Sequence, residues 1–191
     1  MLNVLHLQHR TDRLELLLNQ FKEQGITEYR LWEGKLGQSM RDRRINICAG
    51  HKQIVQHAKD NNLPFVIIAE DDITFTSKGA WDYYLDNMPQ DFDIYFGMIY
   101  SNDKEAIQNN RLVKEACGFT LYTVHQRFYE QFLSAPIDKH IDRSITSWCL
   151  NYEYILPEYF VCHQNDSQSD NTMGKPNLSI FLEGRKLFNR D

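Results

Sequence analysis

The sequence has no excess of basic residues: 21 Lys and Arg stand against 26 Asp and Glu, and the formal net charge is -5. A chain without a basic surface has little to hold a phosphate backbone, so we expect no nucleic-acid partner. Cysteine is also scarce, and none of the four residues forms a CxxC pair. This pattern excludes a zinc ribbon and a dense disulfide framework, and it favours free thiols in a reducing compartment. The four are Cys48, Cys117, Cys149 and Cys162.

Long hydrophobic runs are missing as well. No stretch approaches the roughly 20 apolar residues that cross a bilayer. The first residues, MLNVLHLQHRTDR, reach charged side chains too early for a secretory signal, so we expect a cytoplasmic protein. The 191 residues, 42% of them hydrophobic and 25% charged, suffice for one domain with a sizeable core.

What the sequence does contain is an alternation of strand and helix patterns. It predicts an α/β single-domain sandwich with a mostly parallel sheet over residues 1–177. A basic tail at 178–191 follows, which we expect to be a partly frayed helix. Segment 33–44, rich in Gly and charge, is expected to be a flexible loop, and segment 101–116 a surface loop or short hairpin. Strands are expected at 3–7, 29–32, 92–99, 118–124 and in the run LPFVIIAEDD, and helices at 11–24, 47–61, 78–87 and 125–135.

Three consecutive acids, Glu70, Asp71 and Asp72, follow the longest apolar run of the chain. In open α/β sheets, ligands bind at the carboxyl ends of the strands. Carboxylates this close repel one another unless a cation or hydrogen bonds compensate them, and oxygen ligands suit Mg²⁺ or Mn²⁺. The alternative is that the acids cap the next element and face solvent. Their position directly after VIIA favours a metal site.

These segments together resemble the family 25 glycosyltransferases, the group of lipooligosaccharide and collagen galactosyltransferases. Acids after an apolar strand recur in many nucleotide-sugar enzymes, so the order of the segments carries the resemblance. The chain departs from the family pattern at Gly50, where the family has a serine before its histidine, and at Cys48, where the cysteine falls one place later. The matching segments, spanning about residues 3 to 171, are NVLHLQHRTDR, ICAGHKQIVQHA, VIIAEDDITF, GFTLYTVHQRFYEQFL, HIDRSI and PEYFVCHQNDSQSDN.

The resemblance implies a GT-A-type, nucleotide-sugar-binding fold with an acidic Asp-x-Asp-like motif. Glu70 and Asp72 would be its outer, metal-binding acids, and Asp71 would lie against the bound nucleotide sugar. The implied activity is metal-dependent transfer, with inversion, of a hexose from a UDP-sugar to a glycan acceptor such as lipopolysaccharide. Galactose is the hexose that the resemblance favours, and Mn²⁺ or Mg²⁺ is the cofactor. Through its acceptor, the protein would associate peripherally with the inner face of the membrane.

Two residues late in the chain complete the expected chemistry. GT-A enzymes commonly supply a late histidine as a metal ligand, which here would be His163, although a lone histidine is more often a structural hydrogen-bonding group. Inverting transfer needs a base for the acceptor hydroxyl, and Asp142 in HIDRSI matches the family's single Asp. An Asp before a helix also serves as an N-cap. If Asp142 is only a cap, Asp166 and Asp170 are the next candidates for the base.

Other candidate residues lie near the predicted strand ends. Arg10 and Arg13 follow the first strand, where they would contact uracil or diphosphate oxygens or else form ordinary surface pairs. His51 would hold the charged loop against the nucleotide or fill the entry of a helix. A cluster of aromatic residues is expected in the core rather than stacked on a sugar ring; its members are Trp81, Tyr83 and Tyr84.

Two other functions remain open on the sequence alone. The first is a non-catalytic protein of the same fold that binds nucleotide sugars or serves as a scaffold, which the short length and the Gly50 departure suggest. The second is a metal-dependent phosphohydrolase or phospho-accepting domain, in which Asp71 or Asp72 acts directly on phosphate. The threonine and lysine that such a domain needs are not found at a recognisable downstream spacing.

Overall fold

A computed structural model describes residues 1–101, 103–165 and 186–190. Within these residues, an eight-stranded sheet has the order β2-β1-β3-β8-β5-β9-β7-β6, and a separate ribbon pairs β4 with β10. The strands of the sheet are β1 (Leu2–His6), β2 (Tyr29–Glu33), β3 (Phe65–Glu70), β5 (Ile94–Phe96), β6 (Ile107–Gln108), β7 (Arg111–Leu112), β8 (Leu121–His125) and β9 (Tyr154–Ile155). The ribbon consists of β4 (Ile73–Phe75) and β10 (Cys162–Gln164).

The strand directions correct one expectation. The α/β architecture is confirmed, but the sheet is mixed rather than mostly parallel. Strands β2, β1 and β3 are parallel to one another, whereas β8 lies antiparallel between β3 and β5. The local sequence pattern predicts that a segment forms a strand. The relative direction of two strands depends on which segments pair in the sheet, and these can be far apart in the chain.

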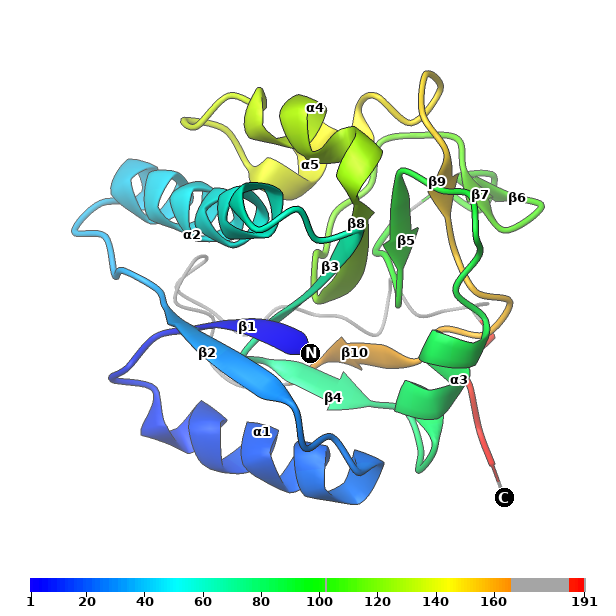
Figure 1. The fold of residues 1–191 in the computed structure, drawn as a ribbon, viewed down its shortest axis with the longest axis horizontal. Helices are drawn as coiled ribbons and strands as arrows, with labels where there is room; N and C mark the ends of the chain where they lie inside the picture. The colour runs from blue at the N-terminus through cyan, green and yellow to red at the C-terminus, as the bar shows by residue number, and fades with distance from the viewer. Residues whose placement is uncertain (102, 166–185, 191) are drawn as a thin grey trace.

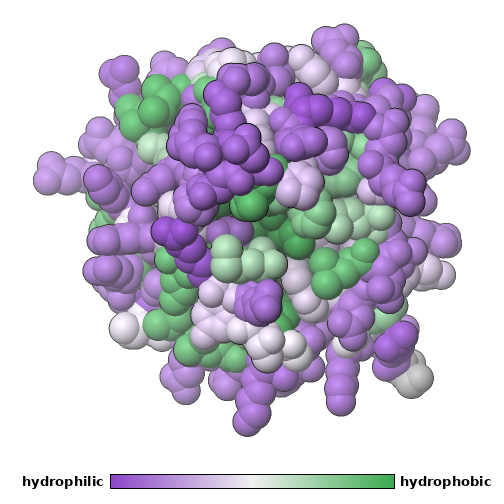
Figure 2. Space-filling view, viewed as in Figure 1, coloured by the Kyte–Doolittle hydropathy of each residue, from purple (hydrophilic) through white to green (hydrophobic). Residues whose placement is uncertain are grey.

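Helices cover both faces of the sheet, as Figure 1 shows: α2 lies on one side of β1 and β3, and α1 lies on the other. Continuous apolar strands such as β3 require this double cover. No helix among the described residues is long and apolar enough to cross a membrane. The face seen in Figure 2 is largely polar, with apolar side chains gathered near its centre. The helices are α1 (Thr11–Gln24), α2 (Met40–Asp60), α3 (Ala80–Asp86), the 3₁₀ turn η1 (Gln126–Phe128), α4 (Tyr129–Leu133) and α5 (Ile141–Thr146).

Helix α2 begins earlier than the sequence pattern indicated, because residues 40–44 are helical and not part of a flexible loop. Its first turn is fixed by a capping box. The Ser39 hydroxyl accepts a hydrogen bond from the Asp42 N–H (3.1 Å), and the Asp42 carboxylate accepts one from the Ser39 N–H (3.1 Å). The apolar periodicity starts only at Ile47, so the charged first turns gave no helical signal of that kind.

Gly50 is explained by packing. A Cβ atom at this position would lie 2.6 Å from Leu5 Cδ1, so α2 approaches β1 this closely only with glycine here. The departure from the family's serine is therefore a feature of the interface between α2 and β1. His51 follows in the middle of α2, not at a helix entry as expected, and its side chain is fully buried.

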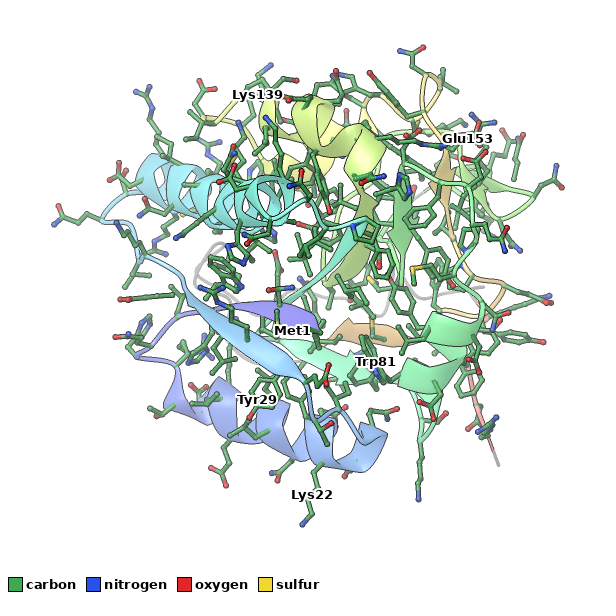
Figure 3. The ribbon with its side chains drawn as sticks, in the orientation of Figure 1. Met1, Lys22, Tyr29, Trp81, Lys139 and Glu153 are labelled. Atoms are coloured by element: carbon green, nitrogen blue, oxygen red, sulfur yellow. The ribbon has the colours of Figure 1, made fainter. Side chains whose placement is uncertain are left out.

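The aromatic cluster of α3 belongs to the core, as expected. Trp81 and Tyr84 are buried, and Trp81 packs edge-on against Phe75 of β4. Figure 3 labels Trp81 near α3. Tyr83 contacts Phe188 near the C-terminus, with ring centroids 4.6 Å apart. Residues 186–190, the described part of the expected tail, are not helical but extended, and Phe188 N–H bonds to the Phe160 carbonyl at 2.9 Å. The boundary predicted at residue 177 lies outside the described residues.

Candidate functional site

The three acids lie at one edge of the sheet, where several strands end together. Strand β3 ends at Glu70, whose N–H donates to the Thr120 carbonyl just before β8 (3.1 Å). Strand β1 ends beside β3, with Leu5 in register with Glu70. The turn at Asp71 and Asp72 then leads into β4. This edge therefore gathers groups from both the N-terminal and the central part of the chain.

Asp71 is buried, and both of its carboxylate oxygens have protein partners. Its Oδ2 lies 2.9 Å from His6 Nδ1 and accepts from the Leu7 N–H (3.2 Å), and its Oδ1 accepts from Arg13 Nη1 (2.7 Å). Burial raises the pKa of this carboxyl, but the His6 hydrogen bond and the Arg13 guanidinium outweigh burial, and the pKa is lowered overall. Asp71 thus fastens the end of β3 to β1 and α1, whereas contact with a nucleotide sugar stays a prediction.

Asp72 has the opposite environment. Its side chain is 15% exposed, and the Arg13 guanidinium is 3.6 Å from Oδ2, too far for a hydrogen bond. Burial and the nearby charge of Glu70 raise the pKa of Asp72 to about 8. The other oxygen, Oδ1, is buried without a hydrogen-bond partner among the described residues. Such an atom is short of one positive or hydrogen-bonding ligand.

Glu70 is held by a chain of two hydrogen bonds from the core. His51 Nε2 lies 3.1 Å from Glu70 Oε1, and His51 Nδ1 lies 2.7 Å from the Tyr122 hydroxyl. Burial, with the charge of Glu70, raises the pKa of Tyr122 well above its ordinary value, so the phenol keeps its proton and donates to Nδ1. His51 then donates from Nε2 to Glu70. His51 is therefore a positioning residue for Glu70.

The two arginines differ in their partners. Arg13 is buried against Asp71, as described above. Arg10 makes a paired contact with Asp12, from Nε to Oδ1 at 2.9 Å and from Nη2 to Oδ2 at 2.8 Å. The Arg10 hydrogen bond lowers the pKa of Asp12 to about 2. Both arginines lie at the carboxyl end of β1, and contact of either with a nucleotide stays a prediction.

Asp142 lies in the first turn of α5, but the N-cap residue of that helix is His140. Its Oδ2 accepts from the Gly118 N–H at 3.0 Å, and its Oδ1 accepts from the Arg143 N–H at 2.7 Å. The carboxylate therefore joins α5 to the segment that leads into β8. The charges of Asp142 and Glu70 both raise the pKa of Tyr122, after the larger effect of burial, so both acids lie close to this ring.

His163 lies on β10, opposite Thr74 in the antiparallel ribbon that follows Asp72. Its Nδ1 is 2.8 Å from the Gln164 carbonyl. A carbonyl can only accept, so Nδ1 carries the proton and Nε2 keeps its lone pair. In a neutral ring, Nε2 would thus be the nitrogen available to a metal ion. Asp166 and Asp170, the alternative bases, lie outside the described residues.

Comparison with known proteins was made for both sequence and structure. No family model and no curated protein matches the sequence. A mannosyltransferase from Pyrobaculum calidifontis, in complex with GDP-mannose and Mn²⁺, has a TM-score of 0.52 and 13% identity, over 87% of this chain and 56% of that one. A mutant Drosophila β-1,4-galactosyltransferase 7, in complex with manganese, UDP-Gal and xylobiose, has a TM-score of 0.55 and 12% identity, over 99% and 81%.

The chain has a GT-A-type glycosyltransferase fold. A glycosyltransferase involved in glycosylation of the major capsid of PBCV-1 is similar too, with a TM-score of 0.50 and 12% identity over 82% of this chain and 81% of that one. At these identities the likeness concerns the fold alone. The chain spans little more than half of the mannosyltransferase.

The described residues do not supply a complete set of ligands for the metal that is expected in a GT-A fold. Among the described residues, no group of three or more His, Cys, Asp or Glu side chains is arranged to hold an ion, so Glu70, Asp72 and His163 do not form a preassembled cluster. The acids themselves fit a cation. Asp72 carries the buried oxygen without a partner, and burial followed by the charge of Glu70 raises its pKa. A bound divalent ion would stabilise the ionised form against both effects. Phosphate oxygens would have to supply the remaining ligands.

Sequence reasoning missed three contributors to this edge of the GT-A fold. His6 compensates Asp71, and the Tyr100 hydroxyl accepts from the Gln164 N–H at 2.9 Å. Gly118 has a φ of +93°, and a Cβ there would lie 2.3 Å from the Tyr100 ring. A glycine leading into a strand was the available signal for Gly118, whereas nothing local identified the other two.

Proposed function

We propose that this protein is a metal-dependent, inverting glycosyltransferase that moves a hexose from a UDP-sugar to a glycan acceptor. Galactose is the first donor sugar to test, and a lipopolysaccharide or lipooligosaccharide glycan is the first acceptor class. The observation that carries the proposal is Asp72: an acid with an unpartnered buried oxygen, beside Glu70, at the strand end where a GT-A fold binds its ligand. A buried carboxylate left in this state destabilises the fold, and a bound cation would offset the cost.

Mn²⁺ or Mg²⁺ would be held by Glu70 and Asp72, with His163 Nε2 as a further nitrogen donor. When bound, the ion neutralises the negative charge that develops on the diphosphate leaving group. His51 keeps the Glu70 carboxylate in place through Nε2. Arg13, fixed by Asp71, adds a buried positive charge beside Asp72. These contacts hold the side chains of the acidic edge in position.

Asp142 would accept the proton of the attacking acceptor hydroxyl. Two backbone N–H groups orient its carboxylate, and both come from rigid positions, at the start of α5 and before β8. A base that is already oriented raises the rate because little entropy is lost when it meets the hydroxyl proton. None of the described contacts of Asp142 is with Glu70 or Asp72. Asp142 can therefore act as the base while Glu70 and Asp72 bind the metal.

The expected partners follow from this chemistry. They are a UDP-sugar and a glycan acceptor, with no nucleic acid. The four cysteines are free thiols, as expected in a reducing compartment, which supports the proposal of a cytoplasmic enzyme acting at the inner face of the membrane through its acceptor.

A screen of nucleotide sugars by thermal shift, with and without Mn²⁺, tests the proposal. A ligand that binds only the folded state at 100 times its Kd adds about 2.7 kcal/mol of stability. We expect a shift with a UDP-hexose that requires Mn²⁺. The absence of a shift for every UDP-sugar, with a control transferase responding normally, would reject the function.

Turnover distinguishes the enzyme from a binding protein of the same fold. Release of UDP from the donor that gives the shift, in the presence of Mn²⁺, should disappear in Asp72→Ala because only background hydrolysis then remains. A Mn²⁺-dependent shift without any such release would identify a non-catalytic nucleotide-sugar-binding protein instead.

A further inference from the structure

Next to the segments that hold Asp142, the surface contains a hollow. The residues proposed to bind the metal or to act as the base do not line it. Its volume is about 280 Å³. Sites for drug-sized ligands typically measure roughly 300 to 1,000 Å³, so this hollow suits a single sugar ring rather than an oligosaccharide. Its lining includes Tyr100, Ser101, Asp103, Glu115, Cys117 and Arg143.

The hollow adjoins the proposed base through the chain itself. Cys117 and Arg143 line it, and they are the neighbours in sequence of Gly118 and Asp142, whose hydrogen bond measures 3.0 Å. Burial, followed by the charge of Asp142, raises the pKa of the Cys117 thiol to about 11, as expected for a thiol next to this carboxylate. A sugar in the hollow would therefore contact the sequence neighbours of Gly118 and Asp142, one residue away from the proposed base.

Tyr100 connects the hollow to the acidic edge. Its backbone pairs with Cys117 through hydrogen bonds of 2.7 and 3.0 Å. Its hydroxyl accepts from Gln164, and the next residue, Asn165, donates its N–H to the Asp72 carbonyl at 2.7 Å. One aromatic residue thus lines the hollow and also reaches the strand that runs beside Asp72.

The charges in the hollow favour an uncharged occupant. Asp103 is paired with Lys114 at 2.5 Å, and Glu115 lies 3.8 Å from Arg143. These side chains are each about half exposed, so the ion pairs are weak. Asp103 Oδ1 also accepts from the Glu105 N–H at 2.8 Å, but a carboxylate oxygen has a second lone pair that can accept from a sugar hydroxyl. Among the described residues that line the hollow, the only cation is Arg143, which is already paired with Glu115. A negatively charged ligand would in addition face two carboxylates.

We propose that this hollow is the acceptor subsite and that it takes one neutral hexose unit, with acidic sugars excluded by Asp103 and Glu115. The inference rests on the proposed function, because an acceptor is needed only if Asp142 acts as a base. It adds the chemical class of the acceptor and the residues that select it.

Backbone-amide NMR tests the subsite with simple probes: methyl β-glucoside, methyl β-galactoside and methyl β-glucuronide. The glucoside and the glucuronide differ only in the charged group. Titrations are run with the full chain, with and without UDP and Mg²⁺, which avoids the broadening caused by Mn²⁺. We expect a neutral glycoside to shift the amides of Ser101, Glu115 and Arg143, and the glucuronide to bind at least tenfold more weakly.

Two variants make the assignment specific. Glu115→Trp should fill the hollow and abolish the glycoside shifts, with UDP binding unchanged because Glu115 is exposed and has no described contact with Glu70, Asp72 or Arg13. The double variant Asp103→Asn, Glu115→Gln should let the glucuronide bind as well as the glucoside. Retained glycoside binding in Glu115→Trp, or no shift of these amides by either neutral glycoside, would overturn the subsite. Failure of UDP to bind wild-type protein would reject the proposed function separately.

Discussion

Gly118 donates its backbone N–H to the Asp142 carboxylate across 3.0 Å, although 24 residues separate them in the chain. The contact depends on the backbone of Gly118, whose φ of +93° lies in a region that residues other than glycine rarely adopt. The space that a side chain would need is filled by the Tyr100 ring. The orientation of Asp142 is therefore determined by a residue that has no side chain.

Gly118→Ala should lower both stability and turnover, because the added methyl collides with Tyr100 and strains the backbone. We expect a loss of about 2 to 4 kcal/mol in urea unfolding, from strain and overpacking together. Gly25→Ala is the matched control. It has a φ of +70° with no atom within 4 Å of the added Cβ, so only about 1 kcal/mol should be lost and turnover should not change. Equal effects of the two substitutions would contradict this account of Gly118.

Asp142→Asn should lower kcat by roughly 10² to 10⁴ and leave the Kd for the UDP-sugar nearly unchanged, because a base is removed but no donor contact. The amide oxygen can still accept one of the two backbone N–H groups, so we expect a stability loss of only about 1 kcal/mol. Steady-state kinetics and calorimetry provide the two readouts. The control is Asp138→Asn, an exposed acid just before α5. Parallel loss of stability and donor binding in Asp142→Asn, with kcat unchanged, would identify a purely structural carboxylate.

His51→Leu should weaken Mn²⁺-dependent UDP binding although the residue is fully buried, because Glu70 loses its hydrogen-bond donor. It also leaves the Tyr122 hydroxyl buried without a partner, at a cost of about 1 to 3 kcal/mol. Tyr122→Phe should cost less and preserve binding. Combining the two should recover part of the stability but none of the affinity. UDP binding that follows stability alone across the three variants would argue against a positioning role.

Arg13→Met should destabilise the fold by about 3 to 5 kcal/mol, because the buried Asp71 loses its cation. Lys59→Met is the control, because Lys59 and its partner Glu130 are 38% and 77% exposed, and it should cost under about 1 kcal/mol. Since pairing lowers the pKa of Asp71, its contribution is present above the ordinary value of 3.8 and is lost as pH falls through the lowered value. The unfolding free energies of wild type and Arg13→Met should therefore converge in acid. A constant difference down to pH 2 would contradict this pairing.

Features encoded by neighbouring residues were predictable from the sequence. The bounds of α1, Thr11–Gln24, followed from apolar spacing and the terminal Gly25. The apolar run of β3 and its three acids identified the edge at which the site lies. The α/β fold class followed from the alternation of elements, and structural comparison bears it out.

Features that depend on distant contacts were not predictable. The antiparallel insertion of β8 between β3 and β5 made the sheet mixed. The sequence did not indicate that Asp71 would be bound by His6 and Arg13, or that Asp72 Oδ1 would be buried without a hydrogen-bond partner among the described residues. His51 was attributed to a helix entry because the charged first turns of α2 hid its true start at Met40. The first two outcomes are decided by partners tens of residues away, whereas the start of α2 is fixed by the local capping box of Ser39 and Asp42.

The most direct test of the central claim is calorimetric titration of UDP-galactose into wild type and Asp72→Asn, each with and without Mn²⁺. We expect binding to wild type only with Mn²⁺, and none to the variant. Because Asp72→Asn removes a buried acid whose pKa is raised to about 8, its melting temperature without metal should equal or exceed that of wild type, so lost binding would not reflect unfolding. Binding that is equally strong in Asp72→Asn, or that needs no metal, would contradict the account.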